Sequence, residues 1–160
     1  MRKAVLGAAV AALAIVLSAC GGGGDDQGSG ATATTAAAQQ AAEGTVAVAS
    51  TGLGEVLVDA KGRTLYVFTK DKGDQSVCSG KCAVVWPALT VTGAVTPGTG
   101  VEASMLSTSK QANGSSQVTY GGKPLYHFAG DMAPGDTKGQ GLNGVWWVVK
   151  GDGSLVQSKG

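Results

Sequence analysis

The feature that most constrains the fold is a motif that occurs twice, sixty residues apart. Residues 62–71 read GRTLYVFTKD and residues 122–131 read GKPLYHFAGD, with half of the positions identical and a basic residue kept at another. Trp86 and Trp146 fall in register at the same offset. A period that is preserved over such a span indicates one supersecondary unit built twice.

Each unit has the pattern of a β-hairpin. In the first, residues 54–59 and 64–69 are rich in β-branched and aromatic residues and flank a short turn. In the second, residues 116–120 and 125–129 flank a turn whose two glycines allow the positive φ of a tight hairpin. A single hairpin is marginal in water. We therefore expect a mainly β, compact single domain of two tandem hairpin-based repeats, related by an internal pseudo-twofold.

The segments outside the hairpins carry weaker signals. Residues 145–149 predict a further strand, and residues 155–157 predict a terminal edge strand. Residues 84–89 predict a short helical turn or a strand end, because a proline stops the apolar run. Residues 102–106 predict one helical turn. No segment has a sustained apolar period of 3.6 residues, so a long amphipathic helix is not expected.

The N-terminus has the three parts of an export signal. A basic start precedes an apolar run over residues 4–16, which is too short to span a bilayer core of about 30 Å, and small residues follow. Residues 17–20, LSAC, resemble the bacterial lipobox. This resemblance implies a signal peptide over residues 1–19, cleavage before Cys20, and acyl chains such as palmitate on Cys20. The alternative is a secretory signal cleaved elsewhere, with Cys20 unmodified.

The remainder of the chain divides into a tether and one domain. Residues 20–44 are rich in Gly, Ala and Thr and contain nothing that builds a packed face, so they predict a flexible tether. The β domain then occupies residues 45–160, the size of one ordinary domain. We place the first repeat at about 52–93 and the second at about 112–157.

The charge balance and the N-terminus together bear on location and partners. Loss of Arg2 and Lys3 with the signal leaves basic and acidic side chains nearly balanced. This balance argues against a nucleic-acid partner and against electrostatic docking to anionic lipid. We expect the domain on the extracytoplasmic side of the cell envelope, anchored to a membrane through lipid on Cys20. The sequence leaves open whether that membrane is the inner or the outer one.

Two cysteines remain once Cys20 is assigned to lipid. Cys78 and Cys82 form an even pair in an oxidising compartment, and their spacing brings the two Cα atoms within disulfide range. A structural disulfide that pins the loop before Trp86 is one interpretation. A dithiol that cycles, or that binds a soft metal, is the alternative.

Alternation within the repeated motif assigns its side chains to faces. Tyr66 and Phe68 lie on one face of the predicted strand, and its intervening apolar residues lie on the other. Phe68 and Phe128 are expected in the core, where burial of each contributes roughly 1.5–3 kcal/mol. Asp71 and Asp131 follow the strand ends, where a carboxylate can shape a turn or accept a tyrosine hydroxyl. The motif therefore predicts either a structural role or a grip on a ligand.

The duplicated motif resembles that of a bacterial family, the predicted lipoproteins with a Yx(FWY)xxD motif, also called the secreted repeat of unknown function. The matching residues are Tyr66, Phe68 and Asp71 in one copy and Tyr126, Phe128 and Asp131 in the other. The resemblance extends over nearly all of residues 52–156. It implies an exported, often lipidated, tandem-repeat domain without an established activity. His127 occupies a variable position of the motif, so no family role is transferred to it.

Three classes of function remain open. The first is a non-enzymatic binding or scaffold module without a cofactor, whose partner is an envelope protein or a small ligand that the sequence does not identify. The second is redox or copper handling by Cys78 and Cys82, with His127 and Met105 or Met132 completing a soft site. Against it, no βαβ pattern accompanies the cysteines.

The third class is an envelope-polymer hydrolase. Glycoside hydrolysis needs two carboxylates flanking the bond, and Asp71 and Asp131 are the pseudo-symmetric pair. Both follow strand ends as turn formers, and no nucleophile elbow accompanies the single histidine. We therefore expect no enzymatic activity, no catalytic residue and no metal site.

Overall fold

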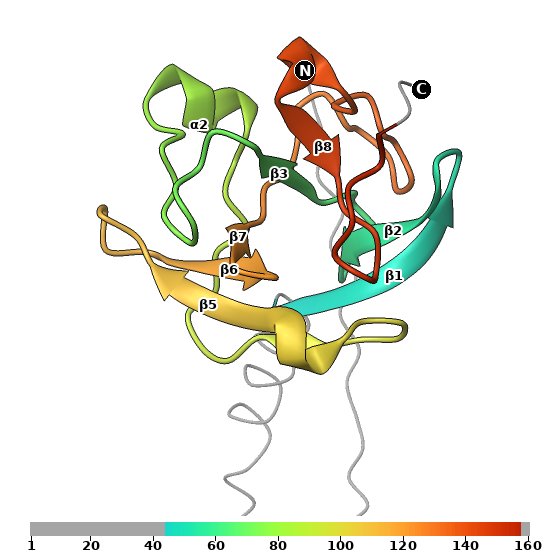
Figure 1. Ribbon diagram of the computed structural model, residues 1–160, viewed down its shortest axis with the longest axis horizontal. Helices are drawn as coiled ribbons and strands as arrows, with labels where there is room; N and C mark the ends of the chain where they lie inside the picture. Colours follow the sequence, from blue (N-terminus) through green and yellow to red (C-terminus); the bar gives the residue numbers. More distant parts are fainter. Residues whose placement is uncertain (1–43, 158–160) are drawn as a thin grey trace, which may run out of the picture.

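The computed structural model describes residues 44–157 of the 160-residue chain. The predicted signal peptide, the predicted lipidation site Cys20 and the predicted tether up to residue 43 lie outside the described residues. The described part is mainly β, with one short α-helix and two 3-10 turns (Figure 1). In chain order its elements are β1 (Thr45–Thr51), β2 (Gly54–Asp59), β3 (Tyr66–Phe68), α2 (Lys81–Val85), β4 (Thr96–Pro97), η1 (Ala103–Met105), β5 (Leu106–Lys110), β6 (Ser116–Tyr120), β7 (Lys123–Pro124), η2 (Leu142–Gly144) and β8 (Trp146–Val148).

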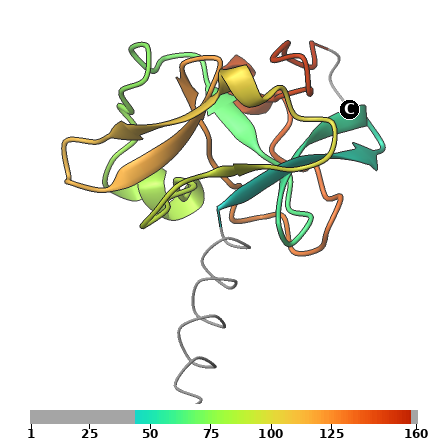
Figure 2. The same ribbon diagram turned by 90° about the horizontal axis from the view of Figure 1, so that it is seen from below.

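Two of the three small sheets contain an antiparallel hairpin, one from each repeat, and differ in where their third strand adds. β1 and β2 form an antiparallel hairpin, to which β4 adds in parallel. β5 and β6 form the second antiparallel hairpin, which β7 extends. Figure 2 shows the β1–β2 hairpin and the β5–β6 hairpin on opposite halves of the molecule. The duplication in sequence is therefore a duplication in architecture.

The third sheet joins the repeats, because it pairs β3 of the first with β8 of the second. The reciprocal contact is also present. Thr69 donates its N–H to the Val145 carbonyl at 2.9 Å, and Ala129 donates to the Val85 carbonyl at the same distance. Each repeat thus completes its backbone hydrogen bonds with the tryptophan segment of the other.

The backbones of Tyr66 and Tyr126 meet between the repeats. The N–H of each donates to the carbonyl of the other, both at 2.9 Å. The two residues are sixty positions apart and equivalent, so this reciprocal pair marks the pseudo-twofold relation. Buried backbone groups need partners, and here neither repeat can supply them alone.

Several predicted strands are shorter than expected. The predicted strand 64–69 is a regular strand only over β3, and the predicted 125–129 is not a regular strand. In residues 125–129, successive N–H groups donate to separate segments of the chain: Tyr126 donates to Tyr66, and His127 donates to Pro87. The chain is bonded throughout this stretch without forming one continuous ladder. The helical turn predicted over residues 102–106 corresponds to η1, whereas the one predicted over residues 84–89 lies earlier in the chain, as α2.

Two apolar clusters lie on the two faces of β3, as the alternation predicts. Leu65 and Val67 belong to the first cluster, and Tyr66 belongs to the second, against which Phe68 packs. The first contains Val46, Leu57, Leu65, Val67, Leu89, Val118, Tyr120, Leu125 and Val149. The second contains Val56, Val58, Tyr66, Trp86, Tyr126, Trp146, Val148 and Val156.

Four aromatic rings form a column inside the second cluster. The order is Phe68, Trp146, Trp86 and Phe128, with ring-centroid distances of 4.3, 3.8 and 4.6 Å. The two central indoles are stacked with an interplanar angle of 3°. Because each phenylalanine packs against the tryptophan of the other repeat, stacked for Phe68 and tilted by 37° for Phe128, the column also holds the repeats together.

The phenylalanines are less buried than the sequence predicts. Phe68 and Phe128 are half-buried, whereas Trp86 and Trp146 are buried. The physical reason is position: the phenylalanines are the two ends of the column, and a column that crosses a small domain reaches its surface. They still pack against the core, so the expectation of apolar contact is correct.

Candidate functional site

The tyrosines and aspartates of the repeated motif pair across the repeats. The Tyr66 hydroxyl donates to Asp131 Oδ2 at 2.6 Å, and the Tyr126 hydroxyl donates to Asp71 Oδ2 at 2.7 Å. The sequence identifies these residue types as partners, but each tyrosine is bonded to the aspartate of the opposite copy. A third group, the Gly139 N–H, donates to the Tyr66 hydroxyl at 3.2 Å.

The second oxygen of each carboxylate is also engaged. Asp71 Oδ1 accepts the Val77 N–H at 2.9 Å, and Asp131 Oδ1 accepts the Lys138 N–H at 3.0 Å. Each aspartate therefore orders the loop that follows its own strand while it holds the tyrosine of the other repeat. This use of both oxygens supports a structural role for the motif.

Burial sets the protonation of these pairs. Desolvation, together with donation to Asp131, raises the pKa of Tyr66 far above its usual range, and burial does the same for Tyr126 beside Asp71. Burial also raises the pKa of Asp71 and Asp131, against the lowering effect of the tyrosine hydrogen bonds. The phenols thus remain protonated donors over the ordinary pH range.

Close packing around Tyr66 leaves room only for a glycine at position 139. A Cβ at Gly139 would lie 2.9 Å from the Tyr66 ring and 2.8 Å from the Trp86 ring. These distances are shorter than ordinary van der Waals contact. The backbone approach of Gly139 is thus part of how the Tyr66 hydroxyl is held.

Cys78 and Cys82 form a disulfide, so the paired cysteines are a structural crosslink in the described state. Both pack against the second apolar cluster, next to the start of α2. The residues considered for a copper site have other surroundings. Met105 packs against the first cluster, and Met132 is 84% exposed. Within residues 44–157, no three His, Cys, Asp or Glu side chains gather into a group that could hold a metal ion.

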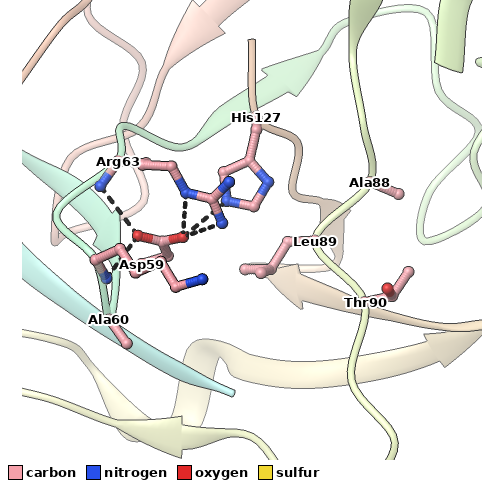
Figure 3. Close-up of a pocket in the computed structure, with 8 residues that line it drawn as sticks. Asp59, Ala60, Arg63, Ala88, Leu89, Thr90 and His127 are labelled. Atoms are coloured by element: carbon pink, nitrogen blue, oxygen red, sulfur yellow. Dashed lines mark hydrogen bonds and ion pairs between the residues drawn. The ribbon is translucent and has the colours of Figure 1, made fainter. Parts of the chain in front are cut away.

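A separate cleft opens beside the turn after β2, with a volume of about 350 Å³. At its base Asp59 is only 5% exposed and accepts hydrogen bonds at both oxygens (Figure 3). Its Oδ1 accepts the backbone N–H groups of Lys61 at 2.9 Å and Arg63 at 3.0 Å. The cleft is lined by Asp59, Ala60, Lys61, Arg63, Ala88, Leu89, Thr90 and His127.

The other oxygen of Asp59 holds two side chains. Asp59 Oδ2 accepts Arg63 Nε at 2.8 Å, pairs with Arg63 Nη2 at 2.6 Å, and lies 3.1 Å from His127 Nε2. Burial opposes the charged form of Asp59, but the hydrogen bonds from His127, Arg63 and Lys61 outweigh it and hold its pKa well below the usual range. Asp59 is therefore a fixed anion that orients an arginine and a histidine.

His127 presents its second nitrogen to the cleft. Nε2 faces Asp59, while Nδ1 has no hydrogen-bond partner among residues 44–157. Every completely buried side-chain nitrogen and oxygen in this part of the chain has a partner, so Nδ1 retains some contact with solvent, although the His127 side chain is only 11% exposed. Figure 3 shows the histidine ring between Asp59 and the wall that carries Ala88 and Leu89.

The equivalent cleft of the other repeat has different chemistry. At the sixty-residue offset, Asp59 corresponds to Thr119, Arg63 to Lys123, and His127 to Val67. Val67 and Lys123 line a second cleft, whereas Thr119 is not among its lining residues. The tyrosines, aspartates and tryptophans are the same in both copies, whereas the Asp–Arg–His cluster occurs once.

Sequence reasoning missed this cluster, although a signal was present. The sequence places Asp59 at a strand end and Arg63 in a turn, and it offers His127 only as a further ligand in the copper alternative. The signal is the comparison of the two copies: one apolar strand position, Val67, is replaced by the only histidine of the chain. His127 is far from Asp59 in sequence. The two residues meet because strands of one repeat pair with strands of the other.

The two halves also match a family model, described as a secreted repeat of unknown function, at residues 47–90 and 107–150. Together these segments make up more than half of the chain. No curated protein and no solved structure matches the sequence. None of the helices within residues 44–157 is long and apolar enough to cross a membrane.

Proposed function

This chain belongs to a family of secreted repeats of unknown function, and we propose that it is an extracytoplasmic, non-enzymatic binding module anchored by lipid on Cys20. We further propose that the cleft of Asp59, Arg63 and His127 is its ligand site. The redox and hydrolase alternatives have less support, because the cysteines form a disulfide and the motif aspartates are engaged by tyrosines and backbone.

The observation that carries this proposal is the difference between the two repeats. Residues that build the scaffold are identical in both copies, as Tyr66 and Tyr126 illustrate. A polar cluster present in one copy alone is not needed for the shared architecture, since the other copy folds with Thr119 and Val67 at the same places. The volume of the cleft lies within the range of small-molecule sites, roughly 300–1,000 Å³.

Membrane fractionation of the full chain tests the anchor. We expect the wild-type chain in the membrane fraction, with an intact mass raised by acyl chains, and Cys20→Ala in the soluble fraction. The physical reason is that several acyl chains give stable anchoring, whereas the rest of the mature chain carries no net basic charge for lipid. If Cys20→Ala stays with membranes after a high-salt wash, the proposed anchor is wrong.

A thermal-shift screen of small organic molecules on the full chain in detergent tests the site. Compounds that raise the melting temperature are measured by calorimetry against His127→Val, which gives this cleft the residue of its counterpart. We expect about tenfold weaker binding to His127→Val, the equivalent of one polar contact. Lys123→Ala, in the other cleft, is the matched control and should bind like the wild type.

Two outcomes would contradict the proposal. Equal binding to His127→Val and to the wild type would place the ligand elsewhere. Recovery of a bound compound with an altered mass after incubation would show turnover, and the module would then be an enzyme.

A further inference from the structure

We infer that the Asp59 cleft selects a small organic carboxylate, whose anionic group pairs with Arg63 and Lys61 and whose short aliphatic part lies against Ala88 and Leu89. This inference rests on the proposed function, because it names the ligand class for the same cleft. It follows from which groups of the cleft remain free to bind.

Asp59 is not available to a ligand. A carboxylate has about four acceptor positions, and Asp59 already receives two backbone N–H groups, the Arg63 side chain and His127. Its side chain is 4% exposed. Asp59 is the only carboxylate among the residues that line the cleft, and its charge is compensated by these hydrogen bonds. It therefore repels an incoming carboxylate less than a free anion would.

The available groups are cationic. The Arg63 side chain lines the cleft and is 44% exposed, and its Nη1 has no hydrogen-bond partner among residues 44–157. Lys61 is exposed and makes no ion pair among residues 44–157. Because the charge of Arg63 compensates that of Asp59, the net positive charge at the mouth of the cleft comes from Lys61. An anionic ligand is the charge complement.

Preorganisation favours a carboxylate over a diffuse anion. Asp59 fixes the guanidinium plane of Arg63, so the ordering of a long side chain does not oppose binding. A planar guanidinium matches a carboxylate in a paired geometry. Across the opening, Leu89 is buried and Ala88 is half-buried, which provides a wall for a few methylene groups. The His127 ring, which also lines the cleft, lies between Arg63 and Ala88 in Figure 3.

The matched probes are butanoate and butanamide, which have nearly the same shape and differ in charge. Calorimetry on the full chain in detergent should detect butanoate, with butanamide bound at least about tenfold more weakly. Lys61→Ala should weaken butanoate by several-fold and reduce its dependence on salt, since Lys61 is exposed. This variant removes an exposed side chain without an ion pair, so the fold is retained; Lys123→Ala is again the control.

The outcomes separate this inference from the proposed function. If butanamide binds as tightly as butanoate, and His127→Val weakens both, the ligand class is wrong while the ligand site stands. If butanoate binds equally to the wild type and to Lys61→Ala, the assigned cation is wrong and the inference fails. Inorganic phosphate binding as tightly as butanoate would overturn the role of the aliphatic wall. Absence of any butanoate binding would also overturn the inference, and the screen described above would still decide the site.

Discussion

Trp146→Ala is expected to lower the free energy of unfolding by about 4 kcal/mol. The Trp146 ring is 3% exposed and contacts three rings at once: it stacks on Phe68 and Trp86 and meets Tyr126 edge-on at 5.2 Å. Its removal opens a cavity in the middle of the column that joins the repeats. Since small domains are stable by about 5–15 kcal/mol, most of the stability is at risk.

Urea denaturation followed by circular dichroism measures this loss. Trp86→Ala, the equivalent change in the other repeat, should have a similar effect because its ring is also buried between two others. Val84→Ala, at a side chain that is 74% exposed, is the control and should change stability by less than about 0.5 kcal/mol. A loss below about 1.5 kcal/mol for Trp146→Ala would show that the column is not central to the fold.

The second large effect is expected from the crossed tyrosine–aspartate pairs. Asp131→Ala removes the acceptor of a buried tyrosine hydroxyl, so it should cost about 2 kcal/mol, and combining it with Asp71→Ala should cost about 4 kcal/mol. A double-mutant cycle of Tyr66→Phe with Asp131→Ala should give a coupling energy of about 1–2 kcal/mol, because the two side chains share one bond.

The internal duplication supplies the matched control. Tyr66→Phe combined with Asp71→Ala joins residues of the same repeat that share no hydrogen bond, so the effects should add within about 0.5 kcal/mol. Tyr126→Phe with Asp71→Ala should be coupled like the first pair. Strong coupling within a repeat and none between repeats would show that the crossed arrangement is wrong.

The candidate site divides into a predictable and an unpredictable part. The disulfide between Cys78 and Cys82 is one of the two interpretations that the sequence offers for these cysteines, because two cysteines close in sequence can form only one disulfide with each other. The aspartates and tyrosines of the motif are recognisable as partners by residue type. The Asp59–His127 contact is not predictable, because it joins the end of β2 in one repeat to an irregular segment of the other.

The sequence did not predict β1 and β5 or the hairpins that they form with β2 and β6. It determined by itself the number of repeats, the strands β2, β3, β6 and β8, and the side of β3 on which each residue lies. These follow from local information: the period of the motif, the glycines of the turns, and the alternation of Leu65, Tyr66 and Val67. Only the tertiary structure decided that the repeats exchange strands, that Tyr66 is bonded to Asp131, and that one cleft carries a charged cluster. The physical reason is that alternation specifies which face of a strand a side chain occupies. The partner of that side chain depends on which distant segment forms hydrogen bonds with the neighbouring backbone.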